Sequence, residues 1–560
     1  MNAPKTDFCM GIRSQRFPML QTAAGMVAML LALIAHSQET VMESRPALAE
    51  TSLGMVQGMS LSSTVDVFKG IPYAAAPVGE LRWQLPQPVA EWEGIWKAEE
   101  FGPDCVQPRA PNAEGPEMSE DCLYLNVWRP AGSKGPFPVM VWIHGGAFQF
   151  GSGSSEYYDG AEFAESGVVL VTINYRLNLA GFFAHPALSE ENEHGISGNQ
   201  GIHDQLAALK WIQDNIGAFN GDPDNITIFG ESAGSMSVCY LVATPLSKGL
   251  FHKAIGQSGG CFNKHPALDD PLENPQSTEG EVSGGGHVVG EFVGRLLGAT
   301  KSGAEGLAEL RAKSPMQLGA SLGASGRSMS WRSIYVDGHL FPDQMRNLVA
   351  SGKGNVVPAI VGSNTDEGTT LYYNLPENEL EDWKENIRAN MGENADRFID
   401  LYMKDAMEST RTASQQMISD TTFAWEMRTW ARLVAQHDTN AFLYVFSHAA
   451  PLALPNAEPT RTFGAFHAAE IPYVFHNSNE EIWNDVDNKV SNLMHSYWVN
   501  FAKTGNPNGP GLPAWDSYDR ERDNSIDLNG EPKMIEGFRM AKLDAWEDVN
   551  SLEPAVAPQE

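Results

Sequence analysis

One serine of this chain lies between two glycines, in the motif Gly-Glu-Ser-Ala-Gly at residues 230–234. A β-branched and aromatic run over residues 226–229 comes directly before the motif, and an apolar helical pattern over residues 233–242 follows. Flanking glycines allow a tight turn from strand to helix, which holds a serine in a strained conformation with its hydroxyl exposed. The N-terminus of the helix stabilises negative charge nearby. The pattern therefore predicts that Ser232 is a nucleophile for acyl transfer.

A second glycine-rich turn supplies a candidate oxyanion hole. It has the sequence His-Gly-Gly-Ala-Phe at residues 144–148 and follows an apolar run. Backbone N–H groups on such a turn reach a tetrahedral oxyanion without steric obstruction. We expect the donors to be the N–H groups of Gly146 and Ala147, joined by that of Ala233 directly after the serine. Losing one such donor typically costs about 3 to 4 kcal/mol of transition-state stabilisation.

A serine nucleophile also needs a base and an acid, which follow it in the chain order Ser, acid, His around this type of turn. Residues 356–362 predict a strand, and its exit carries Asp366 and Glu367 where catalytic groups of open sheets gather. Local sequence does not choose between these two carboxylates. His467 lies in a small-residue loop before an apolar run, as a mobile base requires. Four other histidines also follow the acid: His437, His448, His476 and His495.

The elements that must position these groups belong to the α/β class. Between residues 137 and 260, short β-branched runs alternate with helical patterns, which is typical of βαβ units and a largely parallel sheet. Strands are expected over residues 138–143, 168–173 and 226–229, with a helix over residues 205–219 before the third strand. Pro, Gly, Ser, Asn and acidic residues over 263–286 predict a surface loop, and insertions of this kind usually cap a site.

Charge and composition exclude some classes of function. The net charge of -32, from 70 acidic and 38 basic residues, would repel a polyphosphate chain, so we expect no nucleic-acid partner. His185 and His194 form no convincing ligand cluster, so no metal is expected. The chemistry proposed for the serine needs no organic cofactor. The sequence does not determine the oligomeric state.

The N-terminal residues predict export. Three basic residues lie among the first sixteen, an apolar stretch covers residues 23–35, and Ala-His-Ser at 35–37 has the small-x-small pattern of a cleavage site. We therefore expect a signal peptide over residues 1–37 and one large domain over residues 38–560, in a secreted or periplasmic protein. An uncleaved anchor would need about 20 apolar residues. No stable membrane insertion is expected after cleavage.

The cysteines fit an exported protein. Cys9 falls within the expected signal peptide, which leaves four cysteines in the domain. Cys105 and Cys122 bracket a loop rich in Pro, Gly and Asn, so a bridge between them would pin that loop and contribute about 3 kcal/mol. The four cysteines could pair in three ways on sequence grounds alone, and two buried free thiols are the default expectation for Cys239 and Cys261, whose state the sequence leaves open.

Four further motifs give the chain a specific resemblance. It resembles the carboxylesterase type B family, the group that also contains cholinesterases, from about Gly54 to Asp519. The motifs are Phe-Lys-Gly-Ile-Pro-Tyr-Ala at 68–74, Ser-Glu-Asp-Cys-Leu-Tyr-Leu-Asn-Val at 119–127, Asn-Tyr-Arg at 174–176 and Phe-Asn-Gly-Asp-Pro at 219–223. The resemblance implies an α/β-hydrolase fold, with a central, mostly parallel sheet flanked by helices and large loop and helical insertions. It also implies a serine carboxylic ester hydrolase that acts through an acyl-enzyme on small to medium soluble esters.

The resemblance also assigns site residues. It implies that Glu367 is the acid, that Asp366 is structural, and that His467 is the base. It agrees with a bridge between Cys105 and Cys122. The second bridge of the family would engage Cys261, but no cysteine follows in the expected partner region, which implies that Cys261 is unpaired.

Two departures from the family bear on the substrate. Cholinesterases carry a Trp before the second cysteine that holds a quaternary ammonium, and residues 111–115 contain no aromatic side chain, which disfavours acetylcholine. Ala147 replaces a third glycine of the oxyanion turn, and its backbone donor survives the change. Three alternatives stay open at this point: a non-catalytic, cholinesterase-like adhesion module and, among enzymes, a lipase or an amidase.

Overall fold

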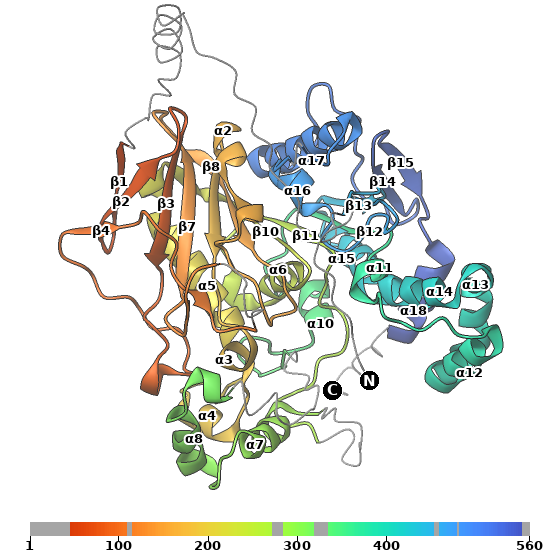
Figure 1. Ribbon diagram of the computed structural model, residues 1–560, viewed down its shortest axis with the longest axis horizontal. Helices are drawn as coiled ribbons and strands as arrows, with labels where there is room; N and C mark the ends of the chain where they lie inside the picture. The colour runs from red at the N-terminus through yellow and green to blue at the C-terminus, as the bar shows by residue number, and fades with distance from the viewer. Residues whose placement is uncertain are drawn as a thin grey trace, which may run out of the picture. The chain divides into compact units, whose positions relative to one another are not determined.

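A computed structural model describes most of the chain from Arg45 to Asn550 (Figure 1). The described residues are 45–108, 115–271, 284–318, 334–452, 459–478 and 481–550. The predicted signal peptide over residues 1–37 lies outside them, as does half of the predicted loop over 263–286.

A 13-stranded mixed sheet organises the described residues. Its central strands run parallel to one another, in the spatial order β9 (Val169–Ile173), β8 (Phe137–Ile143), β10 (Gly221–Glu231), β11 (Lys253–Gln257), β12 (Ala359–Asn364), β13 (Ala441–Phe446) and β14 (Asn524–Leu528). Antiparallel strands extend both edges: β7 (Tyr124–Pro130), β3 (Val65–Pro72), β2 (Gly54–Ser60) and β1 (Pro46–Thr51) beyond β9, and β15 (Lys533–Glu536) beyond β14. β4 (Ile95–Lys97) pairs with β2. The predicted α/β class and largely parallel sheet are confirmed.

Both faces of the central sheet are apolar, as expected for parallel strands covered on two sides. In β8, Val139 and Val141 point into one core, while Met140 and Trp142 point into the other. The first core is covered by α5 (Gln200–Asn215), α6 (Ala233–Ala243), α10 (Met345–Ala350) and α15 (Trp425–Ala435). The second core is covered by α2 (Ala161–Glu165), α16 (Ile471–Phe475) and α17 (Asp485–Thr504).

The remaining helices belong to insertions between these core elements. Two groups stand apart in Figure 1, one built on α4, α7 and α8 and the other on α12, α13, α14 and α18. Their bounds are α3 (Asn178–Phe182), α4 (Pro186–Glu191), α7 (Gly286–Leu296), α8 (Gly303–Arg311), α11 (Gly368–Leu371), α12 (Leu380–Met391), α13 (Ala395–Glu408), α14 (Thr410–Ser419) and α18 (Met540–Asn550). A π-helix, η6 (Asp420–Ala424), joins α14 to α15. Short 3₁₀ turns are η1 (Gly79–Leu81), η2 (Glu156–Tyr158), η3 (Ile216–Phe219), η4 (Pro245–Ser247) and η5 (Gly392–Asn394).

Three predicted elements have other boundaries than expected. The strand expected at 226–229 is part of β10, which begins at Gly221, and the helix expected at 205–219 begins at Gln200. The strand expected at 356–362 begins only at Ala359. Its predecessor Pro358 has no N–H to donate to a neighbouring strand, although its carbonyl accepts a hydrogen bond from Ala254. The apolar run therefore begins before the hydrogen-bonded ladder does.

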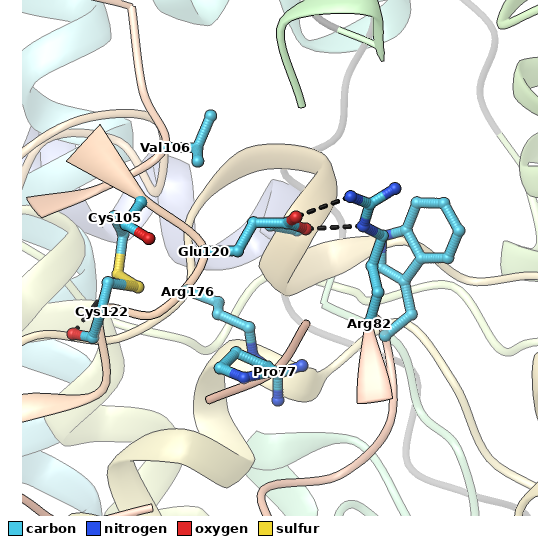
Figure 2. Close-up of a pocket in the computed structure, with 10 residues that line it drawn as sticks. Pro77, Arg82, Cys105, Val106, Glu120, Cys122 and Arg176 are labelled. Carbon is cyan, nitrogen blue, oxygen red and sulfur yellow. Dashed lines mark hydrogen bonds and ion pairs between the residues drawn. A yellow bond between two sulfur atoms is a disulfide. The ribbon is translucent and has the colours of Figure 1, made fainter. Parts of the chain in front are cut away.

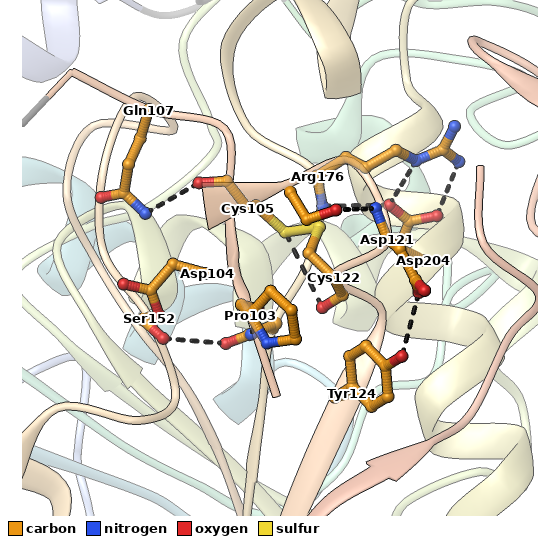
Figure 3. Close-up of a disulfide and its surroundings, with 12 residues drawn as sticks. Pro103, Asp104, Cys105, Gln107, Asp121, Cys122, Tyr124, Ser152, Arg176 and Asp204 are labelled. Carbon is orange, nitrogen blue, oxygen red and sulfur yellow. Dashed lines mark hydrogen bonds and ion pairs between the residues drawn. A yellow bond between two sulfur atoms is a disulfide. The ribbon is translucent and has the colours of Figure 1, made fainter. Parts of the chain in front are cut away.

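The predicted disulfide between Cys105 and Cys122 is confirmed, with a Cα to Cα distance of 5.0 Å (Figure 3). Beside it, Arg82 forms a two-pronged ion pair with Glu120 in a pocket that the bridge also lines, with both nitrogen-to-oxygen distances at 2.6 Å (Figure 2). Arg82 also donates to the carbonyl oxygen of Lys313, 2.6 Å away. Arg82 therefore links the chain just after α8, at Lys313, to Glu120 beside the disulfide.

The expectation of two free thiols was wrong. Cys239 and Cys261 form a second disulfide, with Cα atoms 5.8 Å apart. Cys239 lies on α6 and Cys261 lies just beyond β11, and these two elements pack together. The family resemblance implied a partner further along the chain than Cys261, whereas Cys239 precedes Cys261 by 22 residues. No helix within the described ranges is both long and apolar enough to cross a membrane.

Candidate active site

Ser232 occupies the sharp turn between β10 and α6. Its φ of 56° and ψ of -123° lie where non-glycine residues are uncommon. The turn is fixed by the Ser232 N–H, which donates to the carbonyl oxygen of Gln257 at 2.9 Å. A Cβ on Gly234 would lie 2.0 Å from the carbonyl oxygen of Ile143, so this position needs glycine. The Ser232 hydroxyl forms no hydrogen bond with any described residue, which leaves it available to a ligand.

The structure brings Glu367 to His467. Its Oε2 atom lies 2.6 Å from Nδ1 of the imidazole. Glu367 is fully buried after the end of β12, where its Oε1 accepts a hydrogen bond from the backbone N–H of Asn364 at 2.8 Å. Asp366 points elsewhere and accepts a hydrogen bond from the backbone N–H of Ala465 at 3.0 Å. Asp366 thus holds the loop that carries His467, while Glu367 contacts the ring.

The other four candidate histidines lie in different surroundings. Each contacts a separate partner: His437 with the Val349 carbonyl, His448 with Asp487, His476 with Glu162 and His495 with Ser166. Of the five histidines that follow the acid, only His467 contacts Glu367 in the described part of the chain.

Two further carboxylates, not predicted from the sequence, lie around His467. Oε1 of Glu231 is 3.2 Å from Nε2 of the imidazole and has no hydrogen-bond partner among the described residues. Glu470 is fully buried and accepts hydrogen bonds from the side chains of Asn364, at 2.7 Å, and Gln257, at 3.2 Å. The sequence could have indicated Glu231, because this acid directly precedes the candidate nucleophile Ser232 in the Gly-Glu-Ser-Ala-Gly motif. Nothing in the sequence indicated Glu470, because its partners come from distant strands.

Burial and charge act in opposite directions on these groups. Burial lowers the pKa of His467, but the carboxylates of Glu231 and Glu367 raise it, and the net result is a pKa of about 9. Burial raises the pKa of Glu231 well above its usual range, against the opposing effect of His467. Burial raises the pKa of Glu470 as well. The free site therefore favours a proton on the imidazole at neutral pH.

The predicted oxyanion turn lies directly against the serine. A Cβ on Gly145 would be 3.2 Å from Cβ of Ser232, so the two backbones are in close approach. The turn is strongly bent, with positive φ at Gly146 (105°), Ala147 (55°) and Phe148 (59°). The turn that carries Gly146 and Ala147 therefore lies beside Ser232, the residue before Ala233.

The Asn-Tyr-Arg motif at 174–176 supports the start of this turn. The Tyr175 hydroxyl donates to the carbonyl oxygen of His144 at 2.9 Å, and the two rings stack with centroids 4.5 Å apart. Arg176 is held in turn by a buried ion pair with Asp204, at 2.7 Å. A motif that sequence reasoning used only as a family signature therefore has a structural role beside the site.

One wall of the site comes from the π-helix η6. The ring of Phe423 lies over the His467 imidazole, with centroids 4.9 Å apart. Insertions of this helix type frequently occur at functional sites. Within the described residues, no group of three or more His, Cys, Asp or Glu side chains could hold a metal ion.

Comparisons with known proteins agree with this geometry. The model of the carboxylesterase family matches residues 45–546. The chain belongs to the carboxylesterase family. It is 34% identical to the fumonisin B1 esterase of Sphingopyxis macrogoltabida, over 84% of each chain. It is also 34% identical to the para-nitrobenzyl esterase of Bacillus subtilis strain 168, over 86% of this chain and 95% of that one.

Solved structures of the same family share the fold. A structure of PNB esterase superposes with a TM-score of 0.74 at 32% identity, over 89% of this chain and 99% of the other. The Geobacillus stearothermophilus carboxylesterase EST55 gives a TM-score of 0.73 at 33% identity, over the same shares of the two chains. The protein is therefore an α/β-hydrolase and a serine carboxylic ester hydrolase, which removes the adhesion-module alternative.

Proposed function

We propose that Ser232 is the nucleophile, His467 the general base and Glu367 the acid that orients it. The observation that carries this assignment is the 2.6 Å contact between Glu367 and Nδ1 of His467, whose Nε2 lies 3.2 Å from Glu231, the residue before the strained Ser232. With Nδ1 engaged by Glu367, the serine proton is assigned to Nε2, which also lies near Glu231 in the structure. Attack on an ester carbonyl gives an acyl-enzyme and expels the alcohol. Water activated by the same imidazole then releases the acid.

The oxyanion of each tetrahedral intermediate is assigned to three backbone donors, the N–H groups of Gly146, Ala147 and Ala233. Support comes from the close approach of the 144–148 turn to Ser232 and from the position of Ala233 at the start of α6. Such donors stabilise charge that develops in the transition state, because they are fixed before the reaction begins.

The substrates are assigned to small or medium soluble esters, cleaved outside the cytoplasm. Relatives named for a para-nitrobenzyl ester and for fumonisin B1 support an ester of this kind. The predicted signal peptide over residues 1–37 and the two disulfides support export, since disulfides persist in oxidising compartments. A panel of esters that differ in acyl length, aromaticity and charge would define the preference. Comparable turnover of anilides, or a rate jump on micelles, would favour an amidase or a lipase instead.

Replacement of the nucleophile tests the assignment. We expect Ser232→Ala to lower kcat for a p-nitrophenyl ester by about 10⁶-fold, because no other group can form the acyl-enzyme. A fluorophosphonate should label the wild-type protein at Ser232 with one-to-one stoichiometry and should not label the variant. Full activity in folded Ser232→Ala protein would overturn the mechanism.

A further inference from the structure

Gln107, in the loop closed by the Cys105 to Cys122 disulfide, binds the backbone of Gly151, three residues after the oxyanion turn. Its Nε2 donates to the carbonyl oxygen of Gly151 at 2.9 Å, and its Oε1 accepts from the N–H of the same residue at 2.9 Å. Both backbone groups of Gly151 are thus satisfied by one amide. Nε2 also donates to the carbonyl oxygen of Cys105 at 3.0 Å, which ties the amide to the disulfide itself (Figure 3).

Gly151 lies behind the start of the oxyanion turn. A Cβ on Gly151 would be 2.3 Å from Nδ1 of His144 and 2.6 Å from the carbonyl oxygen of Gly145. A Cβ on Gly146 would be 1.9 Å from the carbonyl oxygen of Phe150, the residue before Gly151. The backbone of residues 150–151 therefore packs directly on residues 144–146, and a shift of Gly151 must displace them.

The turn needs such support because its backbone is unfavourable. Ala147 and Phe148 have positive φ values, and conformations of this kind persist only where the surroundings impose them. On one side, Asn178 donates from its backbone to the carbonyl oxygen of Phe148 at 2.8 Å. On the side of Gly151, the backbone N–H groups of Gln149 and Phe150 donate to the carbonyl oxygen of Gly146 at 2.9 and 3.1 Å, and the Asn178 side chain donates to the carbonyl oxygen of Gln149. Gln107 adds the side-chain hydrogen bonds to Gly151 itself.

We propose that Gln107 is a positioning residue for the oxyanion hole, and that the disulfide loop serves catalysis by holding this amide against Gly151. The inference rests on the proposed function, since it takes Gly146 and Ala147 as the oxyanion donors. Without the amide, the turn can relax away from the geometry that suits the tetrahedral intermediate. Binding of the ground-state ester depends much less on this turn.

Gln107→Met tests the proposal, because Met keeps the length of the side chain and removes its hydrogen bonds. We expect kcat to fall by about 10- to 100-fold, which is less than the loss from deleting an oxyanion donor outright. KM should change by less than about threefold, since the loss falls on the transition state. The inhibition constant of a trifluoromethyl ketone, whose adduct places an oxyanion in the hole, should rise by the same factor as kcat/KM falls. All rates are taken per active site, titrated with a fluorophosphonate.

Gln213→Met is the matched control, because the Gln213 amide also donates to backbone carbonyls, those of Pro223 and Gly249, but away from the site. It should leave kcat and the ketone affinity unchanged. A Gln107→Met protein with normal kcat and ketone affinity per titrated site would overturn the proposal, even if its thermal midpoint fell. Loss of activity in Ser232→Ala with no effect of Gln107→Met would leave the proposed function standing and remove only this inference.

Gln107→Glu gives a second test that does not depend on how Met packs. An ionised carboxylate would repel the carbonyl oxygens of Gly151 and Cys105, whereas a protonated one can donate to one of them. The activity of Gln107→Glu relative to the wild type should therefore rise as the pH falls toward the usual pKa of Glu, about 4.3. A ratio that stays constant with pH would contradict the positioning role.

Discussion

Replacement of Glu231 by Gln should move the pH dependence of the reaction. The Glu231 carboxylate lies 3.2 Å from Nε2 of His467, the nitrogen assigned to the serine proton. A full negative charge at this distance would favour the imidazolium by about 1 kcal/mol in water and about 5 kcal/mol at an effective dielectric constant of 20. The raised pKa of Glu231 reduces this effect, because the carboxyl carries its own proton part of the time. We expect the pKa of His467 to fall by about 1 to 2 units in Glu231→Gln, since each unit corresponds to about 1.4 kcal/mol.

The sign follows from the role of the imidazole. A general base must be neutral, and His467 has a pKa of about 9, so wild-type kcat/KM should rise with pH toward that value. In Glu231→Gln the rise should occur at lower pH. The plateau at high pH should be lower than that of the wild type, because the imidazolium formed in the transition state loses a neighbouring charge. The two profiles should therefore cross.

The assay is kcat/KM for a neutral p-nitrophenyl ester from about pH 5 to 10, corrected for spontaneous hydrolysis. Glu162→Gln is the control, because Glu162 also contacts a histidine, His476 at 3.1 Å, but outside the site. Its profile should overlay that of the wild type. An acidic limb that does not move in Glu231→Gln would show that Glu231 stays protonated in the free enzyme, and would refute the electrostatic reasoning.

Three further changes test the scaffold. Cys239→Ala combined with Cys261→Ala should lower the free energy of unfolding by about 3 kcal/mol, measured by denaturant unfolding, and an unchanged midpoint would contradict a structural bridge. Burial raises the pKa of Asp487, but hydrogen bonds from Arg461 and its other partners lower it well below the usual range. Asp487→Asn should therefore lower the thermal stability of the protein above about pH 4. The stability difference from the wild type should shrink as the pH falls, because the wild type then loses the stabilisation that ionised Asp487 provides. A stability difference that stays constant with pH in thermal scans would be inconsistent with this linkage. Arg82→Met should speed limited proteolysis near α8, because the chain there loses its link to the disulfide, and an unchanged cleavage pattern would count against that role.

The parts of the site that follow one another in the chain could be predicted from the sequence. Ser232 and Ala233 lie within one strand-turn-helix motif, whose geometry is local. Glu367 could not be separated from Asp366 by local reasoning, because adjacent residues on a turn point in different directions that depend on packing. The contact with His467, 100 residues away, makes the distinction.

The parts that sequence reasoning missed arise from packing between distant elements. Cys239 and Cys261 pair because α6 lies over the end of β11, which spacing along the chain does not reveal. Glu470 resembles an ordinary residue at the start of a helix until β11 and β12 bring Gln257 and Asn364 to its carboxylate. Gln107 lies in a polar loop, and only the fold places its amide against Gly151, behind the oxyanion turn.

In the proposed mechanism one imidazole serves both halves of the reaction, and the carboxylates around it can support that role. Glu367 is anchored by a backbone N–H and contacts Nδ1, so it can support a positive ring throughout. Glu470 is satisfied by amide donors and stays behind the site, whereas Glu231 faces Nε2 with an oxygen that has no hydrogen-bond partner in the described part of the chain. Burial raises the pKa values of Glu231 and Glu470, and repulsion from the neighbouring carboxylates raises them further, because three buried carboxyl groups around one ring cannot all be ionised at low cost. Formation and hydrolysis of the acyl-enzyme each create an imidazolium at His467. Glu231 is the carboxyl group that can lose its own proton in response to that positive charge.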